Sequence, residues 1–182
     1  MIFDMTSLDA NEEAHGGLLC KACGLCCTGH LFAWAKLRPV ELDPAEALGM
    51  RVFRTDPTQR GFSQPCPLWK GKCTIYTSSH YPHACRAYQC KLLKEVLAEK
   101  ASLPQALMMI EEAKQRIQEV EALLPPSPNP NFRERLVEQL ESQKAPASPA
   151  GTGAPLQQKA DTLLNFYEEV FGVIDLVDKP EE

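Results

Sequence analysis

Eight cysteines lie between positions 20 and 90 of this 182-residue chain, and none follows position 90. They are Cys20, Cys23, Cys26, Cys27, Cys66, Cys73, Cys85 and Cys90. So many thiols in so short a stretch either pair as disulfides or bind metal. The first 19 residues contain no Lys or Arg, which is not typical of a secretory signal. We therefore expect a cytoplasmic protein whose cysteines bind metal rather than form disulfides.

The composition, 44% hydrophobic and 24% charged, is that of an ordinary globular protein. The longest apolar runs are far shorter than the roughly 18 residues that a membrane-spanning helix requires. We expect no membrane partner.

Charge divides the chain into two parts. Residues 20–94 hold eleven Lys or Arg and four acidic residues, whereas residues 95–182 hold eight and sixteen. Positive charge around thiols lowers their pKa and offsets the charge of a metal–thiolate centre, which is about −2 for tetrathiolate zinc or an oxidised four-iron cluster. Because the basic residues are scattered, nucleic acid is the less favoured partner.

The first four cysteines form a CxxCxxCC run, in which two-residue gaps let the backbone wrap around one metal centre. Gly24 lies where this wrap is tightest. Side chains of adjacent residues diverge, so Cys26 and Cys27 are poorly placed to bind one ion. We expect that they face two centres, or that only one of them binds.

The other four cysteines follow at wider spacing. Residues 66–76, CPLWKGKCTIY, predict a small hairpin that brings Cys66 and Cys73 together. In one continuous helix Cys85 and Cys90 would point about 140° apart, so one precedes the helix or they serve different centres. A CxxCxxC run with a distant Cys-Pro is typical of a 4Fe-4S cluster, which the spacing favours over Zn²⁺.

Together, CxxCxxCC, CPLWKGKCTIY and PHACRAYQC resemble the bacterial zinc- or iron-chelating cysteine-cluster family, whose domain also occurs in flagellin lysine N-methylase. The resemblance covers residues 18–95 and implies that all eight cysteines bind metal. Its flanking matches are Pro67, Ile75, Tyr76, Pro82, Arg86 and Tyr88. The chain departs from the family pattern at residues 77–81, where an Arg-Pro pair is missing, which weakens any role of that arginine in binding an anionic substrate.

Other side chains are weaker candidates. The histidines His30, His80 and His83 could replace a cysteine at the metal, but we interpret them as surface or loop residues. We interpret the aromatic residues Trp69, Tyr76 and Tyr88 as a lid that shields the centre from water. No residue pattern identifies a catalytic group, so whether the protein is an enzyme stays open.

The C-terminal part contains helical patterns. Ser102-Leu103-Pro104-Gln105 predicts a capping box, and the apolar seam that follows is Ala106, Ile110, Ala113, Ile117, Val120 and Leu124. A second apolar face is expected over residues 163–174. We divide the chain into a flexible N-terminus (1–19), a metal-binding domain (20–95), a helical region (96–144), a Pro/Gly/Ala-rich linker (145–158) and a C-terminal amphipathic helix (159–182).

The sequence thus predicts a small α+β cysteine-rich metal-binding domain with short strands and loops, followed by a mainly α-helical C-terminal region. We expect the eight cysteines to hold an iron–sulfur cluster or zinc in a redox or protein-modifying, methyl-transfer-like module that acts on a protein substrate. The alternative is a structural zinc module whose helical tail mediates protein–protein interaction.

Overall fold

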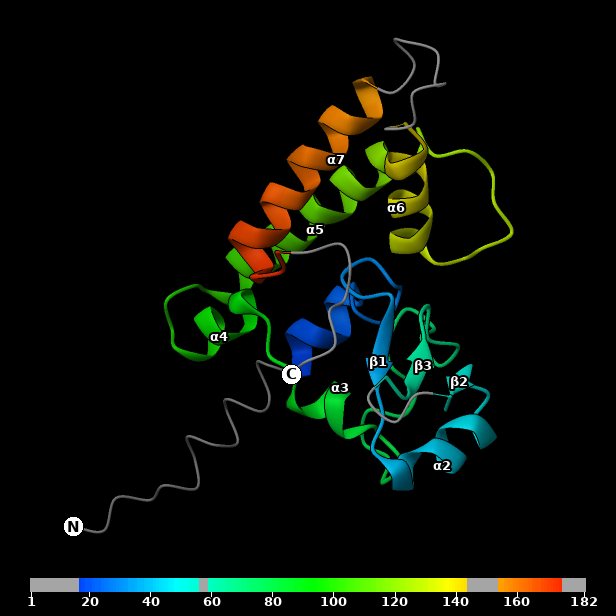
Figure 1. Ribbon diagram of the computed structural model, residues 1–182. Coiled ribbons are helices and arrows are strands. Elements are labelled where there is room, and N and C mark those ends of the chain that lie inside the picture. Colours follow the sequence, from blue (N-terminus) through cyan, green and yellow to red (C-terminus); the bar gives the residue numbers. More distant parts are fainter. Residues whose placement is uncertain (1–16, 56–58, 144–153, 175–182) are drawn as a thin grey trace, which may run out of the picture.

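The computed structural model describes residues 17–55, 59–143 and 154–174, and Figure 1 shows a small sheet with helices around it. The fold is the predicted α+β arrangement: a three-stranded antiparallel sheet in the cysteine-rich half, followed by a helical region. In the described part of the chain, no helix is long and apolar enough to cross a membrane.

The sheet consists of short strands. They are β1 (Trp34–Lys36), β2 (Val52–Phe53) and β3 (Gly61–Ser63), in the order β1-β3-β2. The central residue of β3, Phe62, pairs with Ala35 on one side and Val52 on the other. We name the cluster around Phe62 the sheet core; its buried members are Leu37, Leu42, Ala45, Met50 and Phe62.

Most of the described residues outside the sheet are helical. Residues 17–23 form the first helix, and η1 (Pro39–Glu41), α2 (Leu42–Ala47), α3 (His83–Ala87), α4 (Lys91–Leu97), α5 (Leu103–Glu121), α6 (Phe132–Gln143), α7 (Ala154–Phe166) and the π-helical turn η2 (Tyr167–Phe171) follow. Of the predicted flexible N-terminus, residues 1–16 lie outside the described residues. Residues 17–19 are helical, which corrects that boundary, since Leu19 is buried and anchors the turn.

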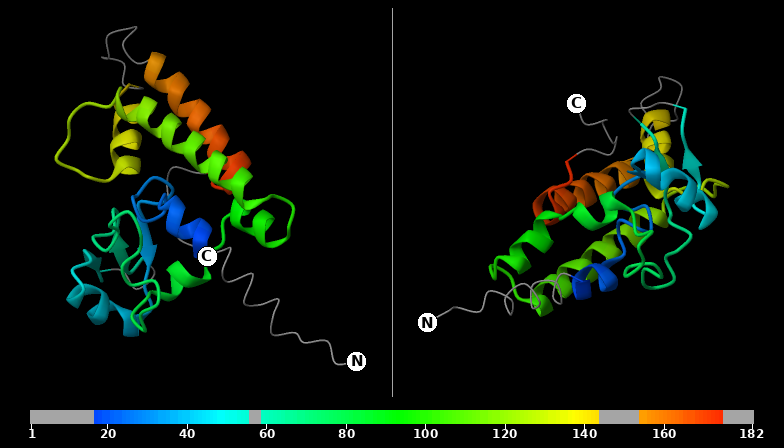
Figure 2. Two further views of the ribbon diagram at one scale, coloured as in Figure 1. Left: turned by 180° about the vertical axis from the view of Figure 1, so that it is seen from behind. Right: turned by 90° about the horizontal axis from the view of Figure 1, so that it is seen from below.

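The longest helix of the described segments, α5, begins and packs as its sequence predicts. The Ser102 hydroxyl accepts a hydrogen bond from the Gln105 amide, and the Gln105 side chain accepts one from the Ser102 amide, which completes the capping box. The whole predicted seam is buried. Figures 1 and 2 show α7 lying alongside α5, and the two helices contact each other along their length.

The linker predicted at residues 145–158 needs a correction. Residues 145–153 lie outside the described residues, but residues 154–158 belong to α7. Proline is tolerated in the first turn of a helix, and burial of Leu156 and Ala160 offsets the Pro-rich composition. At its other end the helical segment stops at Gly172, whose φ is +70°, so Ile174 is exposed rather than part of the apolar face.

One large hydrophobic cluster, which we name the helical core, joins the two halves of the chain. It contains Leu19, Leu25 and Leu31 from the cysteine-rich half together with buried residues of the helices up to Val173. The buried side chains of Asn131 and Arg133, at the start of α6, add hydrogen bonds to the carbonyls of Ala33 and Leu31. Packing therefore crosses the boundary between residues 95 and 96.

Candidate metal centre

The first two cysteines lie on one short helix, residues 17–23. Cys20 and Cys23 are three positions apart, so they share a face of this helix. The helix ends at Gly24, whose φ of +70° is the left-handed conformation that favours glycine. A Cβ atom at Gly24 would overlap the ring of Trp69, so backbone and packing both require glycine here.

Cys26 and Cys27 lie in the turn that follows. The Thr28 amide donates a hydrogen bond to the Gly24 carbonyl at 2.9 Å, which closes the turn. The carbonyl of Cys27 accepts a hydrogen bond from the Cys66 amide at 2.7 Å. This bond attaches the CxxCxxCC run to the second block of cysteines.

Cys66 and Cys73 flank a small reversal of the chain, as predicted. Trp69 and Cys73 form an antiparallel bridge, and Gly71 makes the turn between them with a φ of +72°. Burial raises the pKa of the Cys66 thiol, and charge on Cys73 adds to the effect. The hairpin therefore places these two thiols within electrostatic reach of each other.

Cys85 and Cys90 lie in different surroundings. Cys85 is part of α3, whereas Cys90 caps the N-terminus of α4, and its Sγ accepts a hydrogen bond from the Leu93 amide at 3.4 Å. Cys90 therefore precedes a helix, which was one of the two arrangements that the sequence left open. That Cys85 and Cys90 serve different centres stays a prediction.

Electrostatic interactions among the thiols fall mainly within two sets of four, and the adjacent Cys26 and Cys27 also interact across the division. The pKa of Cys26 is raised first by burial, then by charge on Cys23, on its chain neighbour Cys27, and on Cys90 and Cys20. The pKa of Cys27 is raised by burial and then by charge on Cys66, Cys85 and Cys73, with a smaller contribution from Cys23. We name Cys20, Cys23, Cys26 and Cys90 the first quartet, and Cys27, Cys66, Cys73 and Cys85 the second quartet.

The two quartets also rest on different cores. Cys23, Cys26 and Cys90 pack against the helical core, whereas Cys66 and Cys85 pack against the sheet core. Three thiols of the first quartet and two of the second are therefore positioned by different groups of buried side chains.

Burial reverses one sequence-based expectation about thiol acidity. The net positive charge of residues 20–94 predicts lowered thiol pKa values, and Lys114 and Lys94 do lower the pKa values of Cys23 and Cys90 in part. Burial outweighs this effect and raises the pKa of Cys23 to about 12. Burial likewise raises the pKa of the Cys85 thiol to about 12. Without a bound cation, these thiols stay protonated at neutral pH.

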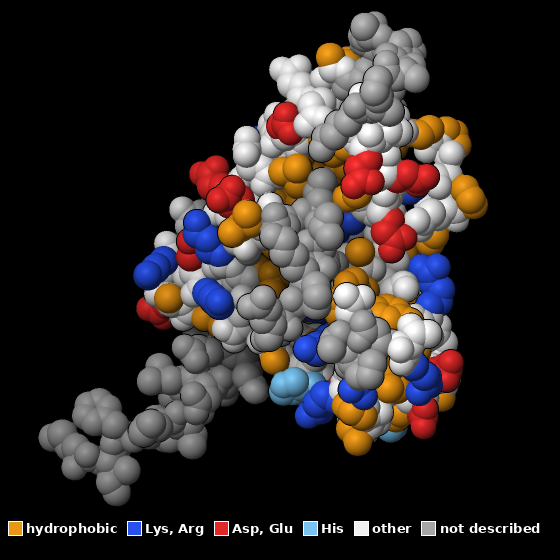
Figure 3. Space-filling view, viewed as in Figure 1, with side chains coloured by type: hydrophobic (Ala, Val, Ile, Leu, Met, Phe, Trp, Pro, Cys, Tyr) orange, Lys and Arg blue, Asp and Glu red, His pale blue; other side chains and the backbone are white. Residues whose placement is uncertain are grey.

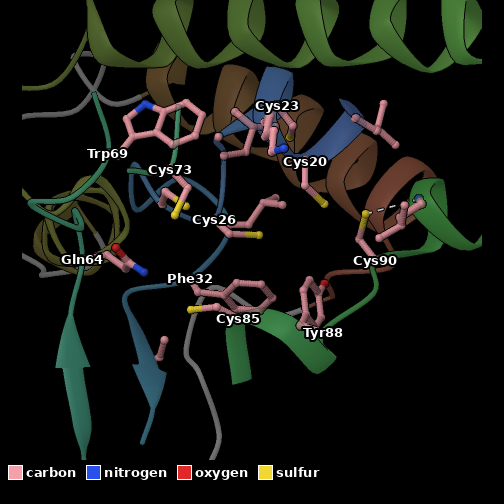
Figure 4. Close-up of a pocket in the computed structure, with 18 of the residues that line it drawn as sticks. Cys20, Cys23, Cys26, Phe32, Gln64, Trp69, Cys73, Cys85, Tyr88 and Cys90 are labelled. Carbon is pink, nitrogen blue, oxygen red and sulfur yellow. Dashed lines mark hydrogen bonds between the residues drawn. The ribbon is translucent and has the colours of Figure 1, made fainter. Parts of the chain in front are cut away.

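A cavity of about 290 Å³ lies between the quartets. Seven of the cysteines line it: Cys20, Cys23, Cys26, Cys27, Cys73, Cys85 and Cys90. Figure 4 shows Cys20, Cys26 and Cys90 on one side and Cys73 and Cys85 on the other. The eight cysteines are all free thiols, so nothing covalent prevents them from binding a group in this space.

Seven of the thiols line the wall of the cavity, and the described thiols form no compact group around one position. Among the described residues, no three side chains of the His, Cys, Asp or Glu type come together closely enough to hold one metal ion. A zinc ion would require four sulfurs at about 2.3 Å from a single centre.

Aromatic rings form much of the remaining wall. Phe32 and Tyr88 meet edge to face with their centroids 5.0 Å apart, and both line the cavity together with Trp69. Tyr88 is 39% exposed, so its ring lies between the thiols and solvent. This placement is what the lid interpretation of these aromatic residues requires.

A second pair of aromatic rings makes cation–π contacts with two basic side chains. The ring centroids of Tyr76 and Tyr81 lie 5.3 Å apart. The Lys21 ammonium lies 4.5 Å from the Tyr76 ring centroid, and the Arg86 guanidinium lies 5.2 Å from the Tyr81 ring centroid. Both tyrosines line the cavity. Arg86 therefore packs on a ring of the cavity wall.

The histidines take part in other contacts. The Nδ1 atom of His30 is hydrogen-bonded to the Thr28 hydroxyl at 2.7 Å, and the ring packs on Phe132. Burial lowers the pKa of His30 to about 4. His80 and His83 are exposed.

One residue of the cavity wall has no sequence pattern that marks it. Gln64 is buried, lies two positions before Cys66 and lines the cavity. Only its proximity to a cysteine could have suggested it.

This chain matches no family model, no curated protein and no solved structure. The resemblance to the cysteine-cluster family thus stays a prediction that depends on the motif residues quoted above.

Proposed function

We propose that this protein is an iron–sulfur redox protein that binds two clusters, one in each quartet. The observation that carries the proposal is the division of eight free thiols into two sets of four, with seven of the eight lining one cavity. Four cysteine thiolates are the usual ligand set of 2Fe-2S and 4Fe-4S clusters.

The size of the space between the thiols supports a cluster over a single ion. A multi-atom cluster needs room between its ligands, and the cavity provides about 290 Å³. A structural zinc site instead draws its four ligands around one atom, and the described His, Cys, Asp and Glu side chains form no group of three that could hold one ion. The donor set and the spacing together favour iron and sulfide.

The charge distribution supports the same assignment. On the face shown in Figure 3, acidic side chains gather mainly over the helical region, whereas Lys and Arg lie mainly around the cysteine-rich part. Two centres of about −2 each would be offset by the net +7 of residues 20–94.

When bound, iron–sulfur clusters accept and release single electrons. The residues of this chain would hold the ligands in place and limit the access of water. Phe32, Trp69 and Tyr88 line the wall, which lowers the local dielectric constant around the thiolates. The N-terminus of α4 directs the Leu93 amide at the Cys90 sulfur, a contact that favours the thiolate form.

Anaerobic purification tests the proposal. We expect a brown protein with about eight iron and eight sulfide ions per chain if both clusters are 4Fe-4S, and an EPR signal after reduction. The matched control is Ala22→Ser, which changes an exposed residue inside the CxxCxxCC run without removing a thiol.

A colourless protein that contains stoichiometric zinc and no sulfide would contradict the proposal. That outcome would favour the alternative of a structural zinc module whose helices bind a partner protein. Methyl transfer to a protein substrate is a proposal based on the family resemblance alone, because no described contact identifies a methyl donor or acceptor.

A further inference from the structure

Gln64 is a buried amide with an unusual environment. It is 3% exposed, and its Oε1 atom has no hydrogen-bond partner among the described residues. Figure 4 shows the side-chain nitrogen turned toward the thiol-lined cavity and the oxygen turned away from it. Buried side-chain polar groups usually have partners. The oxygen stays unpartnered whatever the nitrogen binds, so the feature of interest is the nitrogen that faces the thiols.

The nearby buried amide of Asn131 shows the usual arrangement. Its Nδ2 donates to the carbonyl of Ala33 at 2.8 Å and to that of Gln64 at 3.1 Å. Asn131 thus connects two segments of backbone. Its Oδ1 accepts a hydrogen bond from the Glu134 amide at 3.2 Å, whereas the Gln64 Oε1 accepts none from the described residues.

The backbone of Gln64 is fixed from three directions. Its amide donates to the Ala33 carbonyl at 2.9 Å, and its carbonyl accepts from Asn131 and from the Arg51 guanidinium, each at 3.1 Å. A Cβ atom at Gly29 would lie 3.2 Å from the Gln64 Cβ, so the turn packs closely on this residue. The side chain therefore leaves a well-fixed backbone toward the cavity.

This position is adjacent to the second quartet. Gln64 lies two residues before Cys66, and Gly29, which packs on it, lies two residues after Cys27. The Cys66 amide donates to the Cys27 carbonyl, so the two segments run together at this point.

We propose that the Gln64 side-chain N–H donates a hydrogen bond to a sulfur of the centre held by the second quartet, and so raises its reduction potential relative to the first. The inference rests on the proposed function, because the acceptor is a sulfur of a loaded centre. Reduction adds negative charge to the sulfurs, and a hydrogen bond to an ionised acceptor strengthens with that charge. The donor therefore favours the reduced state.

Redox titration of the intact loaded protein, followed by EPR, tests this role. The signal that disappears in Cys27→Ser identifies the second centre. Gln64→Leu removes the amide. In this variant we expect the reduction potential of the second centre to fall by about 59 mV, which for one electron corresponds to a tenfold change in the reduction equilibrium constant. Gln64→Glu, which adds negative charge, should lower it further.

The first centre serves as the internal control, and Gln118→Leu, which removes an exposed glutamine of α5, is the matched variant. A negative shift confined to the second centre in either Gln64 variant supports the inference. Full iron content with unchanged potentials in both variants overturns it, as does loss of iron from both centres in both variants, which would indicate a structural role. Wild-type protein without iron overturns the proposed function itself, and iron analysis shows this before any variant is compared.

Discussion

Cys26 and Cys27 are neighbours in the chain, yet their thiols belong to different quartets. Cys26 packs against the helical core, whereas the Cys27 carbonyl accepts the hydrogen bond from the Cys66 amide beside the sheet core. Both thiols line the same cavity, but most of the other thiols that interact with each of them differ. The turn after Gly24 thus contributes ligands to both proposed centres.

Replacement of either neighbour should remove one centre only. We expect Cys26→Ser and Cys27→Ser each to lose about half of the iron, with different EPR signals disappearing. Iron analysis and EPR of both purified variants check this. Loss of the same signal in both variants would show that the pair serves one centre.

Of the four later cysteines, Cys66, Cys73 and Cys85 belong to the second quartet, whereas Cys90 belongs to the first quartet with three of the early cysteines. Cys90→Ser should affect the same signal as Cys26→Ser, because both thiols belong to the first quartet. Cys85→Ser should affect the same signal as Cys27→Ser. The four spectra, compared pairwise, test this assignment, and a common effect of Cys85→Ser and Cys90→Ser would contradict it.

Gly24 and Gly71 provide a matched pair of substitutions, since both have a φ near +70°. An Ala at Gly71 meets no atom within 4 Å, so Gly71→Ala should cost only the backbone strain, about 1 kcal/mol. Gly24→Ala adds overlap with the Trp69 ring, so we expect a loss of about 3 kcal/mol or more in the free energy of unfolding. Urea denaturation measures both variants, and equal losses would show that the Trp69 contact has no effect.

The metal-free protein should lose stability at alkaline pH. The pKa of Cys23 and Cys85 is about 12 in the folded state, above the ordinary value of 9.0, because burial disfavours the thiolate. The unfolded chain therefore binds fewer protons above about pH 9, and stability falls as pH rises toward the folded pKa, by at most about 1.4 kcal/mol per pH unit for each thiol. Urea unfolding at several pH values measures the slope. A slope that stays the same in Cys23→Ala and Cys85→Ala would mean that these thiols do not cause it.

Metal removal should loosen the sheet side more than the helical side. The sheet core has few buried residues, whereas the helical core extends along α5, α6 and α7. A metal–thiolate centre contributes about 10 kcal/mol or more in small zinc domains, so its loss matters most where the core is small. Amide exchange should rise more in β1, β3 and α3 than in α5 after complete chelation. An unchanged exchange pattern would show that the folded state does not depend on metal.

Local patterns predicted the local structure well. The capping box at Ser102 and the apolar seam of α5 depend on residues three and four positions apart, so the sequence alone contains them. The hairpin around Gly71 also depends on a short segment. The start of α7 was missed because burial of Leu156 and Ala160 against the rest of the helical core, rather than composition, decides it.

The sequence by itself determined the number of thiols, the CxxCxxCC spacing that puts Cys20 and Cys23 on one turn, and the expectation that Cys26 and Cys27 diverge. Only the tertiary structure decided that Cys90 joins the first quartet and Cys85 the second, and that Gln64 lines the cavity between them. The physical reason is the range of the interactions. Spacing within one turn fixes neighbouring side chains, but the partition of distant thiols depends on which of two hydrophobic cores each segment packs against.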